Sequence, residues 1–438
     1  MKNTQKIVAL VLVLVLAMAL SVTGFAASIT VQSKAPAGST ADVTYTYYEV
    51  MKADIAGDAV AYYVETKALA DALTDTGMFN VTKVAGVDRW NVELKGTASG
   101  EALAKALNVA AVKDAAIAHD TFKANQKVDG LEDGYYLIVA SNGVNLVART
   151  LGDVVVTEKN DYPTVVKTPA VQNAEIGQTV NFTVTVSVPA SVAEKPIKVV
   201  DTISAGLTLN PSVNDGAYTW TAVAGQTGVY SLEIPAAVVA ANAGKDIVLT
   251  YSAVVNENAV VNVPETNKAR VEYDAYVSVE SEVQVFTFGF TLEKVDAKDN
   301  SVKLKDVVFK LTNAAGEYYT AGAADRFGAK EATVATDANG NIVFAGLAAG
   351  QYTLTEVSNP NKGYNLLTDP LVITVNADGS ISYNNSAVKD NVLVVENSKG
   401  SMLPTTGGVG TTIFYVVGLV LVLTAGVTLV ARRRTDAD

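Results

Sequence analysis

Apolar and polar residues alternate with a period of two along most of the chain, which is the pattern of strands that bury one face. The clearest case is the segment "TVNFTVTVSVP", in which every second residue is apolar and falls on the same face: Val180, Phe182, Val184, Val186 and Val188. Similar alternation recurs in "KDIVLTYSAVVN", "NKARVEYDAYVSVE" and "FTFGFTLEKVD". The pattern predicts a mostly β protein built from tandem β-sandwiches.

Turn signals and a few helical stretches interrupt this strand pattern. The segments "DANGN" and "NADGS" predict hairpins. Their acidic residues also suit calcium loops, but the later ligands that such a loop needs do not follow, so turns are the favoured interpretation. Two stretches near the N-terminus, "YYVETKALADALTDTG" and "SGEALAKALNVAAVKDAAIAHDTF", predict helical insertions, and the second includes His119.

Both ends of the chain are strongly apolar. The first 26 residues carry Lys2 and Lys6, then an uncharged run and small residues, the layout of a secretory signal cut near Ala26. Residues 411–431 hold no charge and are long enough to cross a bilayer as one helix. Three arginines follow them and favour a cytoplasmic end. The sequence therefore predicts an exported chain whose tail is caught in the membrane.

Changes of pattern along the chain predict five segments. They are a signal peptide (1–26), an N-terminal domain with helices (27–158), a second sandwich (159–283), a third sandwich (284–399) and a C-terminal sorting segment (400–438).

Composition excludes several classes of function. The net charge of −12 does not favour nucleic acid. The chain has no cysteine, so disulfides and thiolate chemistry are absent. It has a single histidine, and a catalytic triad or a metal site would need partners for it that the chain does not offer. No Walker loop, GxGxxG helix start or HExxH motif occurs. We expect no cofactor, no metal and no conventional enzyme.

Some charged and amide residues fall in phase with the apolar face of their strands. In the third domain these are Lys294, Glu356 and Asn397, and in the second they are Lys167, Asp201 and Asn267. A slipped register or a snorkelling side chain would explain any one of them. Three such residues in one domain point instead to a shared role.

The C-terminal pentapeptide gives the first family resemblance. Together with the apolar segment and the arginines, it resembles the cell-wall sorting signal of Gram-positive surface proteins, an LPxTG motif: Leu403, Pro404, Thr405, Thr406 and Gly407. The resemblance implies that a sortase attacks the carbonyl of Thr406, releases the chain from Gly407 onward and passes the acyl group to an amine. Pro404 suits this role, because it disfavours helix and keeps the site extended. A simple membrane anchor would give the pentapeptide no role.

The in-phase polar residues resemble two kinds of collagen-adhesin domain. The third domain resembles the B-type, which implies an isopeptide bond between Lys294 and Asn397 that Glu356 promotes. The second resembles the A-type, which implies a bond between Lys167 and Asn267 promoted by Asp201. Burial favours the neutral amine and the protonated acid that the reaction needs. The protonated Glu356 is then expected to donate to the Asn397 carbonyl and polarise it for attack by Lys294. In the first domain Ala140 takes the place of the acid when "GYYLIVA" is aligned with "GQYTLTE", so no bond is expected there.

The whole chain resembles a three-domain backbone pilin of sortase-assembled pili. That family carries an acceptor lysine at the end of the first domain, and Lys159 in "VTEKN" fits by position. The usual Tyr-Pro pair is missing before this lysine and follows it at Tyr162 and Pro163. Lys167 is the rival, but a buried lysine used in an internal bond cannot also face a sortase.

The resemblance implies a structural shaft subunit that is secreted, covalently anchored to the Gram-positive cell wall and displayed on the cell surface. Its expected partners are a sortase, other copies of the chain and peptidoglycan, with accessory pilins and a host ligand left open. Membrane contact is expected only for the precursor, through the C-terminal helix. The alternative is a monomeric wall-anchored adhesin, which would need no acceptor lysine.

Overall fold

The computed structural model describes residues 27–191, 195–401 and 409–435. The predicted signal peptide (1–26) and the pentapeptide at 403–407 lie outside the described residues. The chain divides into two compact units, the first reaching Phe288 and including the loops 322–326 and 346–348, and the second holding the rest. Strands dominate both units, so the predicted mostly β fold is confirmed.

The N-terminal part of the first unit contains a small and a large sheet. The small sheet places β1 (Ala27–Gln32) between β11 (Asp153–Thr157), which is parallel, and β8 (Lys127–Leu131), which is antiparallel. The large sheet runs β10-β9-β3-β4-β6-β5, with β7 also paired to β3. Its strands are β3 (Thr44–Ala56), β4 (Ala59–Val64), β5 (Phe79–Lys83), β6 (Trp90–Leu94), β7 (Ile117–Lys123), β9 (Gly134–Ala140) and β10 (Asn145–Thr150).

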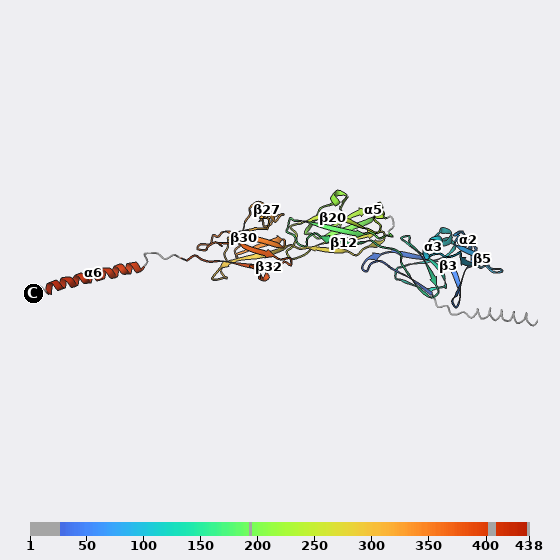
Figure 1. The fold of residues 1–438 in the computed structure, drawn as a ribbon, viewed down its shortest axis with the longest axis horizontal. Helices are drawn as coiled ribbons and strands as arrows, with labels where there is room; N and C mark the ends of the chain where they lie inside the picture. The colour runs from blue at the N-terminus through green and yellow to red at the C-terminus, as the bar shows by residue number, and fades with distance from the viewer. Residues whose placement is uncertain (1–26, 192–194, 402–408, 436–438) are drawn as a thin grey trace, which may run out of the picture. The chain divides into compact units, whose positions relative to one another are not determined.

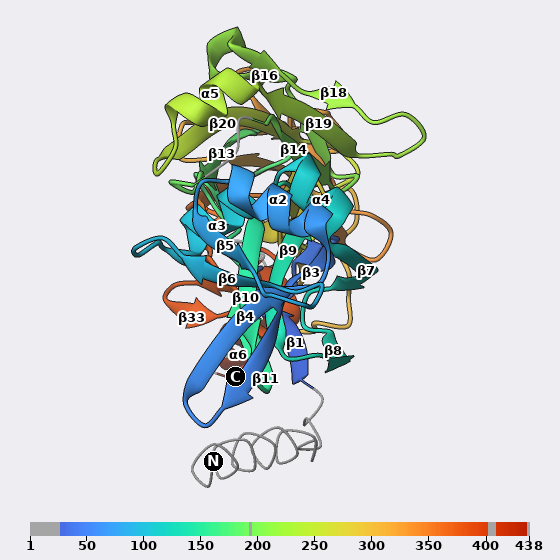
Figure 2. The ribbon, with the colours of Figure 1, turned by 90° about the vertical axis from the view of Figure 1, so that its right-hand side faces the viewer.

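Three short helices gather at this part of the first unit: α2 (Lys67–Asp75), α3 (Gly100–Leu107) and α4 (Ala110–Ala115). Figure 2 shows them side by side. Their apolar residues, among them Leu73 and Leu107, share one core cluster with Val50 and Leu137 of the large sheet. Thr66 and Ser99 cap α2 and α3 by accepting hydrogen bonds from the first turn.

His119 lies on strand β7, so its prediction as a helical residue is wrong. The helical pattern ends at Ala115, and residues 117–123 pair with β3 instead. The imidazole stacks on Tyr47 with ring centroids 4.8 Å apart. Pairing with a long strand and aromatic packing outweigh the helix propensity of the alanine-rich segment before it.

The second part of the first unit is a sandwich of two sheets. One sheet runs β12-β13-β20-β15 and the other runs β18-β19-β14-β21-β22-β2, with β23 also paired to β21. The strands of the first sheet are β12 (Thr164–Pro169), β13 (Thr179–Ser187), β15 (Leu207–Leu209) and β20 (Asp246–Val255). Those of the second are β2 (Thr40–Ala41), β14 (Ile197–Ile203), β18 (Thr221–Ala222), β19 (Val229–Ile234), β21 (Glu265–Tyr273), β22 (Tyr276–Val277) and β23 (Ser281–Val285).

The apolar face predicted for "TVNFTVTVSVP" is confirmed, because its five in-phase residues are all buried in the core of this sandwich. Short elements complete the part: β16 (Ser212–Val213), the turn η1 (Asn214–Gly216), β17 (Tyr218–Thr219) and α5 (Ala236–Ala241). Figure 1 labels β12, β20 and α5 within this part.

The second unit is also a two-sheet arrangement. A small sheet runs β29-β24-β34, and a large sheet runs β27-β26-β25-β30-β31-β32-β33, with β28 paired to β25. The small sheet contains β24 (Phe288–Asp296), β29 (Asn341–Leu347) and β34 (Val392–Asn397). The large sheet contains β25 (Val308–Thr312), β26 (Tyr318–Tyr319), β27 (Phe327–Gly328), β28 (Val334–Ala335), β30 (Gly350–Ser358), β31 (Leu371–Val375), β32 (Ile381–Tyr383) and β33 (Ser386–Ala387), and the turn η2 (Lys389–Asn391) precedes β34.

The two predicted hairpins of this unit have different outcomes. The "NADGS" hairpin is confirmed, since β31 and β32 pair directly across it. The "DANGN" segment closes the same kind of turn, with Asp337 N bonded to Asn341 O, but the pairing stops there, because β28 and β29 pair with different strands in different sheets. The turn itself is closed by a hydrogen bond from Gly340 N to Asp337 O, and Gly340 has a positive φ of 74°.

Candidate functional site: two buried lysine–asparagine–acid clusters

The polar residues singled out in the second part of the first unit meet in its core. Lys167 comes from β12 in one sheet, whereas Asp201 on β14 and Asn267 on β21 come from the facing sheet. The Lys167 ammonium contacts both the Asp201 carboxylate and the Asn267 carbonyl oxygen. The side chains of Asp201 and Asn267 are fully buried. The sandwich fold thus brings together residues that are up to 100 positions apart.

A tyrosine that the sequence pattern did not single out completes this cluster. Tyr251 on β20 donates a hydrogen bond to Asp201 Oδ2 at 2.7 Å and accepts one from Asn267 Nδ2 at 3.0 Å. Its ring stacks on Phe182, with centroids 5.6 Å apart, and meets the edge of Trp220 at 5.3 Å. In the sequence Tyr251 lies in phase with apolar neighbours on β20, so it looks like an ordinary core tyrosine.

Burial controls the protonation of this cluster. Desolvation lowers the pKa of Lys167 to about 8, although the neighbouring Asp201 opposes the shift. Desolvation also raises the pKa of Asp201, and that of Tyr251 lies well above its ordinary value. One oxygen of Asp201, Oδ1, is buried without a hydrogen-bond partner. These shifts favour a neutral amine beside a neutral acid, the pair of states that an amine needs to attack an amide.

The second unit holds a similar cluster with a different division between sheets. Lys294 on β24 and Asn397 on β34 belong to neighbouring parallel strands of one sheet, and Glu356 on β30 belongs to the other. The Lys294 ammonium contacts Asn397 Oδ1 and lies 3.5 Å from Glu356 Oε2. Asn397 Nδ2 donates to Glu356 Oε1 at 2.7 Å.

The environment of Lys294 is also strongly apolar. Its side chain is fully buried, and desolvation lowers the pKa of its ammonium to about 8, with Glu356 acting against the shift. The second oxygen of Glu356 accepts a hydrogen bond from the backbone N–H of Leu367 at 3.2 Å. Glu356 therefore touches both the amine and the amide nitrogen of its cluster.

In both clusters the lysine contacts the amide oxygen, whereas the amide nitrogen contacts Glu356 in the second unit and the hydroxyl of Tyr251, which is bonded to Asp201, in the first. The expected donation from Glu356 to the Asn397 carbonyl is therefore wrong, because Glu356 contacts the amide nitrogen and Lys294 contacts the carbonyl oxygen. An acid at the nitrogen can protonate the group that leaves when an amine replaces it.

The first domain presents a different picture. Ala140, at the end of β9, is buried in the core of the N-terminal part and carries no titratable group. The absence of an internal bond in this domain stays a prediction.

Lys159 lies between two buried polar residues, Glu158 and Asn160. Its own side chain is 53% exposed, and its ammonium lies 3.6 Å from Glu101. Lys167 is almost completely buried. Of the two lysines considered as acceptors, only Lys159 is open to another protein.

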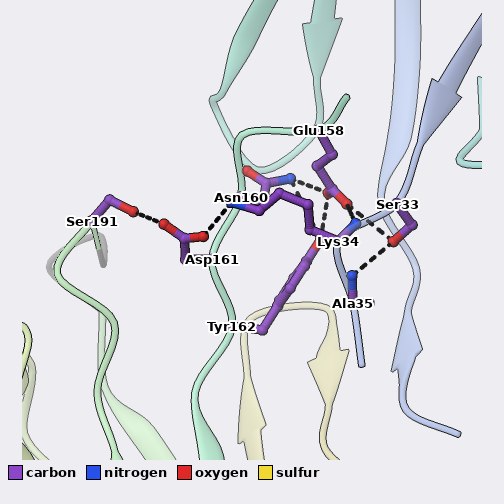
Figure 3. A network of polar contacts seen from close by, with 8 residues as sticks. All are labelled: Ser33, Lys34, Ala35, Glu158, Asn160, Asp161, Tyr162 and Ser191. Atoms are coloured by element: carbon purple, nitrogen blue, oxygen red, sulfur yellow. Dashed lines mark hydrogen bonds and ion pairs between the residues drawn. The ribbon is translucent and has the colours of Figure 1, made fainter. Parts of the chain in front are cut away.

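A network around Glu158 fixes the backbone on both sides of Lys159 (Figure 3). Glu158 accepts hydrogen bonds from Ser33 Oγ and Lys34 N at 3.0 Å each, and also from Asn160 Nδ2 and Tyr162 OH. Burial alone would raise the pKa of Glu158, but these hydrogen bonds outweigh it and hold the pKa below the ordinary value. The ionised carboxylate thus holds the flanking residues inward while Lys159 points outward.

The apolar helix α6 (Val409–Thr435) follows the second unit. Its segment Thr412–Arg432 is long and apolar enough to cross a membrane, with a mean hydropathy of 2.6.

Two family models match the chain. Residues 288–387 match the prealbumin-like fold domain called SpaA, and residues 395–437 match the LPXTG cell wall anchor motif. No protein with a curated description matches the chain.

Solved structures similar to this chain include several pilins. The T6 backbone pilin of Streptococcus pyogenes serotype M6 is 15% identical with a TM-score of 0.51, and the match covers 86% of this chain and 99% of that one. The major pilin SpaA of Corynebacterium diphtheriae is 15% identical with a TM-score of 0.48, covering 86% and 100%. The group B streptococcus pilus 2b backbone protein is 22% identical with a TM-score of 0.43, covering 55% and 99%.

The anchor motif and the apolar helix together define where the protein resides. The chain is a surface protein anchored to the cell wall of a Gram-positive bacterium, and it carries a prealbumin-like SpaA domain and an LPXTG cell wall anchor motif.

Proposed function

We propose that this chain is the shaft subunit of a sortase-assembled pilus, and that two self-formed Lys–Asn isopeptide bonds stabilise it. The observation that carries the proposal is the pair of buried lysine–asparagine–acid clusters in a chain that ends in a wall-anchor motif. Three folded domains (27–158, 159–283 and 284–399) form the exported body, and 1–26 is removed as a signal peptide.

Each internal bond forms by a single exchange of amide nitrogen. The neutral lysine amine attacks Cγ of the asparagine, a new Nζ–Cγ bond forms, and the Cγ–Nδ2 bond breaks. The proton that the amine loses passes through the acid to Nδ2, which leaves as ammonia. Asp201 and Glu356 act once, within their own chain, so the protein is not an enzyme in the usual sense.

A sortase polymerises the subunits. The sortase thiol takes the acyl group of Thr406, releases the segment that begins at Gly407, and transfers the acyl group to the Lys159 amine of the next subunit. The exposure of Lys159 between two inward-facing residues supports this choice of acceptor. The last subunit passes its acyl group to peptidoglycan.

The two internal bonds suit a fibre under tension. A pull that enters at Lys159 and leaves at Thr406 crosses the second and third domains and bypasses residues 27–158. Bonds from 167 to 267 and from 294 to 397 keep about 200 residues out of the extensible path, each able to release about 3.3–3.6 Å of length. The first domain lies outside this path and needs no such bond.

The test is a change of Lys159 to Arg in a producing cell, with Lys195→Arg as the control. Lys195 lines the same surface pocket as Lys159 and is half-exposed, so it is a matched lysine. Wall extracts of the unmutated strain should contain a ladder of SDS-resistant polymers and a Thr406–Lys159 branched peptide. Lys159→Arg should abolish the ladder while the monomer stays anchored, and Lys195→Arg should leave the ladder intact.

An undiminished ladder in Lys159→Arg would show that another lysine is the acceptor. Anchored monomer without any ladder in the unmutated strain would favour the wall-anchored adhesin instead.

A further inference from the structure

The two clusters differ in how the acid reaches the amide nitrogen. In the second unit Glu356 contacts Asn397 Nδ2 directly, at 2.7 Å. In the first unit Asp201 is one methylene shorter, and in the part of the chain that the structure describes it reaches Asn267 Nδ2 only through the hydroxyl of Tyr251. The tyrosine hydroxyl takes the place that the longer acid fills in the other cluster.

From this geometry we infer that Tyr251 is the proton relay of the Lys167–Asn267 reaction, carrying the proton from Asp201 to the departing amide nitrogen. The inference deepens the proposed function and rests on it.

The hydroxyl is well suited to this role in the resting state. It donates to Asp201 Oδ2 and accepts from Asn267 Nδ2, so it already connects the acid to the leaving group. Burial raises the pKa of Tyr251 well above its ordinary value, so the hydroxyl keeps its proton at neutral pH.

The direction of both hydrogen bonds reverses during the reaction. After Lys167 Nζ attacks Cγ, the carbon becomes tetrahedral and Nδ2 becomes an amine with a free lone pair. Asp201, neutral at the start, gives its proton to the Tyr251 oxygen as the hydroxyl gives its own proton to Nδ2, and the resulting carboxylate takes up the proton that Nζ loses. The Cγ–Nδ2 bond breaks, ammonia leaves, and Asp201 and Tyr251 recover their starting protonation states.

The packing around the ring keeps the hydroxyl at this position. Phe182 is the direct cross-strand neighbour of Tyr251 and stacks on it, and Trp220 contacts it from its edge. Lys167 Nζ lies 5.1 Å from the centre of the same ring. The ring therefore lies against the amine, and its hydroxyl reaches the acid and the amide.

Tyr251→Phe distinguishes proton transfer from packing, because it removes the hydroxyl and keeps the aromatic ring. The experiment follows the whole exported chain in a cell without sortase, by intact mass and by mapping of branched peptides at successive times after synthesis. Tyr251→Phe should slow the Lys167–Asn267 link on the order of 10²-fold, the usual contribution of a positioned proton-transfer group. The Lys294–Asn397 link should form at its unmutated rate.

A second variant gains function, which a folding defect cannot imitate. Asp201→Glu combined with Tyr251→Phe gives the acid the reach of Glu356, and it should form the first-unit link faster than Tyr251→Phe alone. The matched control is Tyr276→Phe, a buried tyrosine of the same core whose ring stacks on Tyr162. It should form both links at the unmutated rate.

The outcomes distinguish the relay from the proposed function. An unmutated chain that never loses ammonia would overturn the internal bonds, and the relay with them. Normal linkage in Tyr251→Phe, or no gain from the double change, would overturn the relay alone and leave the proposed function standing.

Discussion

The lysine–asparagine clusters of the two units solve one chemical problem with different strand arrangements. In the first unit the lysine lies in one sheet and the asparagine in the facing sheet, so their bond would join the two layers of the sandwich. In the second unit both residues lie on neighbouring parallel strands of the same sheet. In both clusters the group that contacts the amide nitrogen comes from the sheet opposite the asparagine, namely Tyr251 or Glu356.

This difference shows which features the chemistry requires. The position of the acid's strand varies, since Asp201 lies beside the asparagine strand and Glu356 lies opposite it. The buried amine at the amide oxygen and the proton donor at the amide nitrogen do not vary. A fold can therefore change the sheet that supplies each group as long as the donor reaches the leaving nitrogen.

The largest expected effect comes from removing either acid. Asp201→Ala and Glu356→Ala should each retain one of the two ammonia molecules that the unmutated protein loses. The two bonds close loops of similar length, 100 and 103 residues. Each loss should therefore lower the free energy of unfolding by about 4–5 kcal/mol, as the chain-entropy estimate for cross-links gives. Intact mass and chemical denaturation measure the two effects.

Isosteric variants separate the bond from the packing around it. Asp201→Asn and Glu356→Gln keep the volume of the side chain but cannot carry the proton, so each should retain one ammonia, as the alanine variants do. Unequal losses of stability, well beyond about 1 kcal/mol, would mean that the two arrangements are not equivalent. Loss of both ammonia molecules in either variant would show that the substituted acid is not needed for the reaction.

The two-residue alternation along the strands predicted the six residues of the clusters, because each is a charged or amide side chain at an inward position. The alternation did not distinguish Tyr251, since a tyrosine on the same strand face as Leu249 and Ala253 looks like an ordinary core residue. Only the pairing of β20 with β13 and the facing position of β14 show that its hydroxyl meets Asp201. Hydrogen bonds between sheets depend on tertiary packing, which a single-strand pattern does not contain.

The prediction for His119 went wrong for a related reason. An alanine-rich segment has high helix propensity, and the competing partner, β3, lies far away in the sequence. The inward position of Glu158 had a readable signal, because it is in phase with Val154 and Val156 at the end of β11. Its role as an acceptor for residues 33 and 34 depends on a contact across more than a hundred residues.

A second test compares the pKa values of Lys294 and Lys167 in variants that lack the partner asparagine and so cannot form the isopeptide bond. Asn397→Ala keeps Glu356 but leaves Lys294 without an acyl partner. Its folded pKa of about 8 lies below the ordinary value of 10.5, so between these pH values the unfolded chain binds more protons than the folded one. The free energy of unfolding should therefore rise with pH across this window, by up to about 1.4 kcal/mol per unit.

The counterpart in the first unit is Asn267→Ala, which leaves Lys167 free with a pKa also near 8. It should show the same rise over the same window, and below about pH 8 the destabilisation should be complete and constant. The unmutated chain should show neither rise, because an amide nitrogen does not titrate there. A flat profile in both variants would show that the free lysines keep their ordinary pKa. Urea denaturation at a series of pH values provides the measurement.

The smallest effect on stability, and the sharpest test of acid reach, is expected from Glu356→Asp. The change withdraws the carboxyl by one methylene, about 1.5 Å, from an amide nitrogen that it now contacts at 2.7 Å. The second cluster has no tyrosine hydroxyl among its described contacts to bridge the gap, so the Lys294–Asn397 link should form on the order of 10²-fold more slowly. Molecules that do complete the link should unfold at nearly the same denaturant concentration as the unmutated protein, because the same loop is closed.

Time-resolved intact mass measures the rate of this link. The Lys167–Asn267 link in the same molecules is the internal control, since its acid is already an aspartate. A link that forms at the unmutated rate would show that acid length is not limiting, and that the hydroxyl of Tyr251 does not compensate for a shorter side chain.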